Sequence, residues 1–137
     1  MSNKLCRQVI ESRLAEWAAA RAPALPVAWQ NVRFTEPVGT YLRAFLLPAD
    51  TGSDDLAGVH RLYRGVYQIN VCAPINAGPG EAEKVAAELA ALFPNNLRLP
   101  ATDLILQVIS PVSAGASAQP EDRYVLPVSF RYRADVT

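Results

Sequence analysis

The sequence predicts an α+β fold in which one mostly antiparallel or mixed sheet of about five strands carries two main helices on a face. Two observations indicate this class. Apolar residues recur at helical spacing over residues 3–21 and 80–93, whereas they alternate with other residues, as in β-strands, over residues 60–73 and 123–133. The chain has 137 residues, enough for one domain and too few for two, so we expect a single domain over residues 1–137.

The first helix is expected over residues 3–21. Cys6, Ile10 and Leu14 follow one another at intervals of four, which places them on one side of a helix. Pro23 prevents the helix from continuing, because proline lacks the N–H that a helix interior requires.

Five extended segments complete the expected secondary structure. They are a short segment at 25–34, an apolar strand at 40–48, long strands at 60–73 and 123–133, and a buried strand at 103–110. In the two long strands one side is expected to face the core: Gly65, Tyr67, Ile69 and Val71 in the first, and Tyr124, Leu126, Val128, Phe130 and Tyr132 in the second.

The second helix, residues 80–93, begins after the glycine-rich turn Gly78-Pro79-Gly80, a position where many proteins bind phosphate. The residues after the turn argue against such a site. A P-loop requires Lys and Ser or Thr directly after the last glycine, and here Glu81 and Glu83 lie in the first helical turn. We therefore expect a helix start with its own acidic residues and no nucleotide.

Two loops separate these elements, at residues 49–59 and 111–122, and both are rich in small or polar residues. We expect the loop 111–122 to be flexible in the free monomer and ordered after assembly with a partner.

Charge and composition exclude several functional classes. The 13 basic and 13 acidic side chains cancel, so no specific nucleic-acid partner is expected. The N-terminus carries charges throughout, unlike a secretory signal, and no apolar run approaches the roughly 18–20 residues of a membrane span. We expect no membrane partner.

No arrangement of residues predicts catalysis, a metal or another cofactor. Cys6 and Cys72 are expected to be buried, reduced thiols. His60 is the only histidine, and it lies about 40 Å from Cys72 along a continuous strand, so these two cannot pair. A pairing of His60 with Cys6 through the fold remains open.

Four arginines lie on expected strands, with Tyr63 and Tyr132 nearby. They are Arg43, Arg64, Arg131 and Arg133. A stacking platform for single-stranded nucleic acid is one interpretation. The balanced charge favours instead a solvated sheet face or a contact between subunits.

Several stretches together resemble the tail-terminator-like proteins of long-tailed phages and integrated prophages. They are PVAWQNVRF, YLRAFLLPAD, YRGVYQINVCAPINAGPGEAEKVAAELAALFP and YVLPVSFRYRAD, in this order from about residue 24. The resemblance implies a structural protein without catalytic residues, similar to the lambda-type terminator. Such a protein forms a six-membered ring on the last ring of the tail tube, stops its polymerisation and offers a surface to the head connector.

The resemblance also implies partners and a location. The partners are further copies of the chain, the major tail tube protein and the head–tail connector proteins, and the location is the virion tail after assembly in the bacterial cytoplasm. Strand arginines are expected to pair with acidic residues across a subunit or tube interface. The candidate residues are Arg43, Asp54, Asp55, Arg64, Glu121, Asp122, Arg131 and Arg133.

Two alternative functions stay open at this point. One is a module that binds a small molecule or peptide in a pocket lined by Trp29, Tyr63, Tyr67 and Tyr132. The other is an enzyme that uses Cys6 or Cys72 as its nucleophile.

Overall fold

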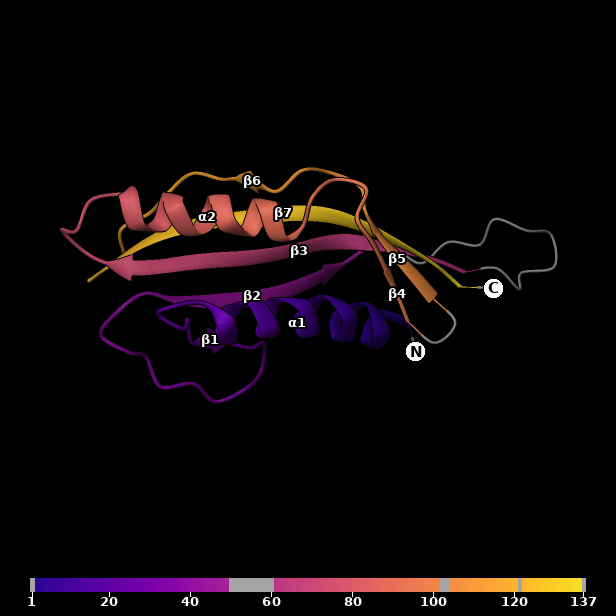
Figure 1. Cartoon of the computed structure of the whole chain (residues 1–137), viewed down its shortest axis with the longest axis horizontal. Helices are drawn as coiled ribbons and strands as arrows, with labels where there is room; N and C mark the ends of the chain where they lie inside the picture. Colours follow the sequence, from indigo (N-terminus) through magenta and orange to yellow (C-terminus); the bar gives the residue numbers. More distant parts are fainter. Residues whose placement is uncertain (1, 50–60, 102–103, 121, 137) are drawn as a thin grey trace.

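The computed structural model describes residues 2–49, 61–101, 104–120 and 122–136. Within these ranges the chain forms two helices and one seven-stranded sheet (Figure 1). In chain order the elements are α1 (Ser2–Ala20), β1 (Val27–Ala28), β2 (Tyr41–Pro48), β3 (Arg61–Pro74), α2 (Gly80–Leu92), β4 (Arg98–Pro100), β5 (Leu104–Val108), β6 (Ser113–Ala114) and β7 (Arg123–Val136).

The α+β class is confirmed, but the expected number of about five strands is wrong. β4 and β6 have three and two residues, too few to show an alternating pattern, and β4 ends in Pro100. The segment expected at 25–34 contributes only the two residues of β1. Backbone pairing with other strands, and not local sequence, makes these short segments part of the sheet.

The strands run in the order β1-β2-β3-β7-β5-β4, and β6 also pairs with β7. β1 is parallel to β2 and the other pairs are antiparallel, so the sheet is mixed. β3 and β7 form its centre, paired from Arg61 with Val136 to Pro74 with Arg123. β7 extends beyond its expected end at residue 133 because the first residues of β3 hold it in register.

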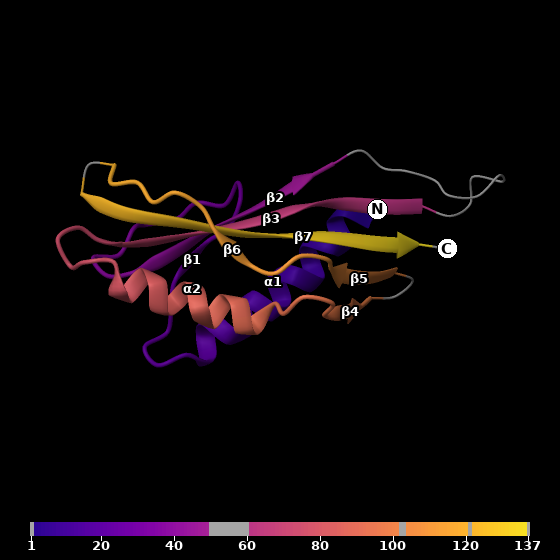
Figure 2. The ribbon, with the colours of Figure 1, turned by 90° about the horizontal axis from the view of Figure 1, so that it is seen from above.

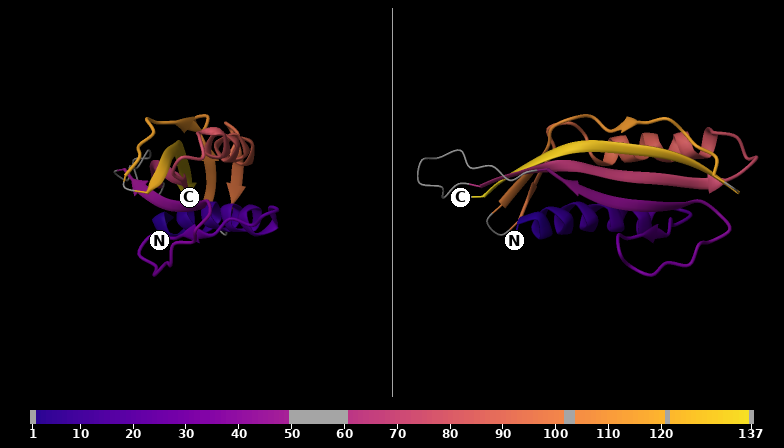
Figure 3. Two further views of the ribbon diagram at one scale, coloured as in Figure 1. Left: turned by 90° about the vertical axis from the view of Figure 1, so that its left-hand side faces the viewer. Right: turned by 180° about the vertical axis from the view of Figure 1, so that it is seen from behind.

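Both helices lie on the same side of the curved sheet, as the views from above and from the end show (Figures 2 and 3). The core between them is one cluster of buried side chains. α1 contributes Cys6, Ile10 and Leu14, and α2 contributes Val85 and Leu89, all fully buried. Because strand side chains alternate, the opposite side of β2, β3 and β7 carries a different set of residues and has no helix over it.

The inward sides expected for the two long strands are confirmed. Tyr67, Ile69 and Val71 of β3 are buried, as are Phe130 and Tyr132 of β7. The hydroxyl groups of Tyr67 and Tyr132 lie in the core without a hydrogen-bond partner in the described structure.

The loop expected at 111–122 is held along β7 by backbone hydrogen bonds in its described part. The N–H of Gly115 donates to the carbonyl of Pro127 at 2.7 Å, and Ala118 exchanges hydrogen bonds with Val125. Its side chains from residue 113 to 120 are exposed. The expected gain of order on assembly stays a prediction.

Candidate functional site

The candidate functional site is the sheet face that points away from the two helices, which we call the open face. Its side chains alternate with those of the core. They include Arg43, Phe45 and Leu47 on β2, Arg64, Val66, Gln68 and Asn70 on β3, Arg123, Ser129, Arg131, Arg133 and Asp135 on β7, Ile105 and Gln107 on β5, and Arg98 on β4.

Four arginines of the open face gather toward the end of the sheet where β3 begins and β7 ends. Arg64 lies directly opposite Arg133, and Arg133 lies opposite Gln107. Gln107 in turn pairs with Arg98, so these residues form one row across four strands. Arg131 precedes Arg133 by two residues on the same side of β7. We call Arg64, Arg98, Arg131 and Arg133 the arginine cluster.

Little negative charge within the described chain compensates this cluster. Arg133 donates from Nη2 to Oδ1 of Asp135 at 3.2 Å. The guanidinium groups of Arg64, Arg98 and Arg131 form no hydrogen bond or ion pair with any described residue. Because like charges directly opposite on paired strands repel, the cluster is unfavourable in the isolated chain and favours an acidic partner.

Aliphatic side chains stand beside the arginines. Leu47 is 47% exposed and Ile105 is 48% exposed, and both belong to the open face. Ile109, 37% exposed, follows β5, and its N–H donates to the carbonyl of Arg131. Exposed aliphatic groups next to arginine are typical of protein–protein interfaces, where arginine is enriched.

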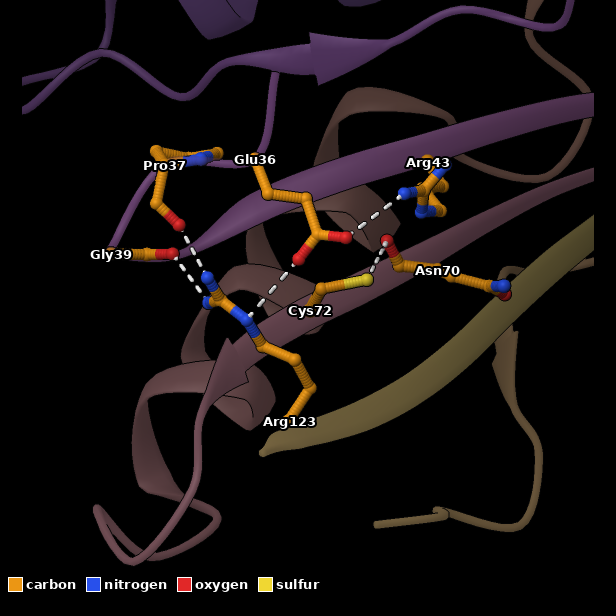
Figure 4. A network of polar contacts seen from close by, with 7 residues as sticks. All are labelled: Glu36, Pro37, Gly39, Arg43, Asn70, Cys72 and Arg123. Carbon is orange, nitrogen blue, oxygen red and sulfur yellow. Dashed lines mark hydrogen bonds and ion pairs between the residues drawn. The ribbon is translucent and has the colours of Figure 1, made fainter. Parts of the chain in front are cut away.

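At the other end of the open face, Arg123 of β7 holds the segment that precedes β2 (Figure 4). Its guanidinium donates to the carbonyls of Pro37 and Gly39. Glu36 forms ion pairs on both sides, with Arg123 at 3.8 Å and with Arg43 at 3.5 Å. These contacts attach residues 36–39 to the sheet. The sequence of this segment does not predict that attachment.

The same two arginines lie against the ring of Tyr41. The Cζ atom of Arg43 is 5.5 Å from the ring centroid and that of Arg123 is 5.1 Å away, within cation–π range. Phe34 packs on the same ring, with 5.2 Å between centroids. This end of the open face is therefore closed by the chain itself.

A cavity of about 260 Å³ lies in this region and has Cys72 in its lining. Cys72 is buried, and its thiol donates to the carbonyl of Asn70 at 3.9 Å. Burial raises the pKa of this thiol, which disfavours the reactive thiolate.

The structure brings together some of the candidate interface residues and separates others. Arg64, Arg131 and Arg133 belong to the arginine cluster, whereas Arg43 is engaged by Glu36. Asp122 is exposed and lines the cavity beside Arg43 and Arg123. The role of these residues in an interface stays a prediction.

Four residues considered in the sequence analysis lie outside the described residues: Asp54, Asp55, His60 and Glu121. The open question of a pairing between His60 and Cys6 therefore stays open.

Sequence analysis missed Arg98 and the contacts of Arg123. Arg98 alternates with Leu99 in a three-residue strand, too short a signal to place it on the open face. The partners of Arg123 lie 84 and 86 residues earlier in the chain, where local patterning gives no signal.

The pocket expected for a binding module does not form as described. Tyr67 and Tyr132 are fully buried in the core, so they line no surface pocket. Trp29 lines a separate shallow cavity of about 390 Å³ with Leu25 and Val27. Among the described residues no group of three or more histidine, cysteine or acidic side chains is placed to hold a metal.

The thiol of Cys6 is equally unsuited to nucleophilic chemistry. It is fully buried on the core side of α1, and burial raises its pKa to about 11. Neither cysteine forms a disulfide. In the described part of the chain, neither helix is long and apolar enough to cross a membrane.

Comparisons with known proteins agree with this architecture. Several solved structures match the chain, and one of them is 51% identical with a TM-score of 0.83, covering 100% of this chain and 96% of that one. The name of that structure states no function. No curated protein gives a significant match.

One protein family, described as phage tail terminator protein, matches residues 6–132. The match spans both helices and the sheet almost to the end of β7. The chain therefore belongs to the phage tail terminator protein family, whose members are structural components of phage tails.

Proposed function

We propose that this protein closes the end of a phage tail tube as a ring of six identical subunits. The ring stops polymerisation of the tube and offers the surface to which the head connector binds. Its partners are further copies of itself, the major tail tube protein and the head–tail connector proteins. The observation that carries the proposal is the family match over residues 6–132.

The geometry supports an assembly role over a catalytic one. The open face presents a charged and aliphatic surface of five strands with no helix over it. Both cysteines are buried, with raised pKa values. These residues form a surface suited to binding other proteins, and neither buried thiol is suited to act as a nucleophile.

The test is inactivation of this gene in the phage or prophage that encodes it, with tails imaged by electron microscopy. We expect tails of variable, extended length that do not join heads, and restoration of uniform tails when the wild-type chain is supplied from a plasmid. Averaged images of restored tail ends are expected to show a sixfold ring. Uniform tails joined to heads in the absence of the chain would refute the proposal.

A further inference from the structure

We propose that the arginine cluster of one subunit binds the acidic first turn of α2 of the next subunit. This inference rests on the proposed ring and names the surfaces that hold it together. The interface is expected to contain the uncompensated guanidinium groups of Arg64 and Arg131 on one side and the carboxylates of Glu81 and Glu83 on the other.

The open face has the chemistry of a surface that requires a partner. Arg64 and Arg131 are exposed, and neither pairs with a described residue. Leu47 and Ile105, each about half exposed, stand on the same face. A partner with carboxylates set in a small, mostly apolar surface would neutralise the arginines and cover the aliphatic groups.

The described acidic side chains were compared to find that partner surface. Four of them are already engaged within the chain: Glu11 with Arg7, Glu36 with Arg43 and Arg123, Glu88 with Arg21, and Asp135 with Arg133. Glu81 and Glu83 are exposed, make no ion pair with a described residue and lie on the two flanks of the first turn of α2, on either side of the buried Ala82. Arg21 interacts with Glu81 through space, but its ion pair is with Glu88. Glu16 and Asp122 are also exposed, but each stands on a different element.

Small apolar groups flank Glu81 and Glu83, and the exposed Lys84 directly follows them on α2. Ala77 and Pro79 precede them and Ala87 follows on the helix, and all three are exposed. Apart from Lys84, the exposed side chains next to the two carboxylates are short, so the open face of another copy can come close enough for guanidinium–carboxylate contacts.

The two surfaces cannot meet within one chain. The arginine cluster lies where β3 begins, and α2 follows the turn after β3 ends (Figure 1). The ten residue-to-residue steps of β3 from Arg64 to Pro74 span about 33 Å. Contact between them therefore joins different patches of two copies, which is the heterologous geometry that a closed ring requires.

Charge reversal tests the pairing. The first variant is Arg64→Glu with Arg131→Glu, and the second is Glu81→Arg with Glu83→Arg. Each is expected to lower the fraction of tail ends that carry a ring by about tenfold or more, because like charges then face each other. A chain with all four substitutions reverses both surfaces together, and we expect it to recover most of the rings.

Two control variants each carry one charge reversal at another exposed site, half the change of charge in each double variant. They are Arg33→Glu, in the segment before β2, and Glu16→Arg, on α1. Both are expected to form rings as the wild type does. Circular dichroism and thermal unfolding of every variant establish that loss of rings is not loss of folding.

The outcomes separate this inference from the proposed function. If the wild type and the controls form rings and the reversed variants do so equally, the inference is wrong and the function stands. If both reversed variants lose rings and the fourfold variant does not regain them, the open face meets another protein, and the inference is again wrong. If the wild type itself forms no ring on tails, the proposed function fails and the inference with it.

Discussion

Replacement of Gly65 by alanine is expected to destabilise the fold, although Gly65 lies in a regular strand. A Cβ atom at this position would lie 2.5 Å from the carbonyl oxygen of Leu47 and 2.9 Å from the Cα atom of Pro48. It would also lie 2.8 Å from the hydroxyl oxygen of Tyr132. Two of these neighbours are backbone atoms of β2, so a side-chain rotation cannot relieve the contact.

The expected loss of folding free energy follows from these distances. Ordinary contact begins at 3.4 Å, so the backbone of β2 must move by about 0.9 Å relative to Gly65. Overpacking of this kind costs about 1–3 kcal/mol, and the lower entropy of alanine in the unfolded chain offsets about 0.4–1 kcal/mol. We expect a net loss of about 1–2 kcal/mol, which for 137 residues lowers the Tm by about 3–7 °C.

Urea unfolding and calorimetry of the purified variant measure this loss. Gly39→Ala is the matched control, because a Cβ atom there has nothing within 4 Å. The control is expected to keep the wild-type stability within about 0.5 kcal/mol. A Gly65→Ala chain as stable as the control would show that β2 can shift without loss of folding free energy, and the reasoning from contact distance would be wrong.

Three further predictions concern the core and the contact between the helices. Tyr132→Phe removes a buried hydroxyl without a partner in the described structure, so urea unfolding should show equal stability or a gain of up to about 1 kcal/mol. Arg21 donates to both carboxylate oxygens of Glu88, at 2.9 and 3.0 Å, and this hydrogen bonding lowers the pKa of Glu88. The pair therefore stabilises the fold above the carboxyl pKa of the unfolded chain and loses this effect as the pH falls through the lower folded value. Glu88→Gln should cost about 0.5–1 kcal/mol at pH 7 and progressively less toward pH 3, whereas a constant cost would exclude the ion pair as its cause. The thiols of Cys6 and Cys72 should react with iodoacetamide at pH 8 far more slowly in the native protein than in urea, and equal rates would contradict their burial.

Local periodicity predicted the helices and the long strands well because it depends on neighbours in sequence. Val85 and Leu89 repeat at helical spacing, and both are buried in α2. Tyr67 and Ile69 alternate with Gln68 and Asn70, and both face the core. The same reasoning failed for β4 and β6, which are too short to carry a period and exist through pairing with β5 and β7.

The candidate site was predicted only in part. Arg64, Arg131 and Arg133 were expected on an outward face, and they lie there. The position of Arg98 in the same row as Arg133 was not expected, since it depends on the pairing of β4 with β5 and of β5 with β7. The attachment of residues 36–39 by Arg123 likewise required the folded chain.

The sequence by itself determined which side of each long element is apolar, and therefore the class of fold and the residues available for an outer surface. It also carried the resemblance to tail terminators, which the family match confirms. Only the tertiary structure decided that Arg64 stands opposite Arg133, 69 residues later in the chain. The physical reason is that strand register is a property of backbone hydrogen bonds between distant segments, so the charge pattern of a sheet face arises only when those segments pair.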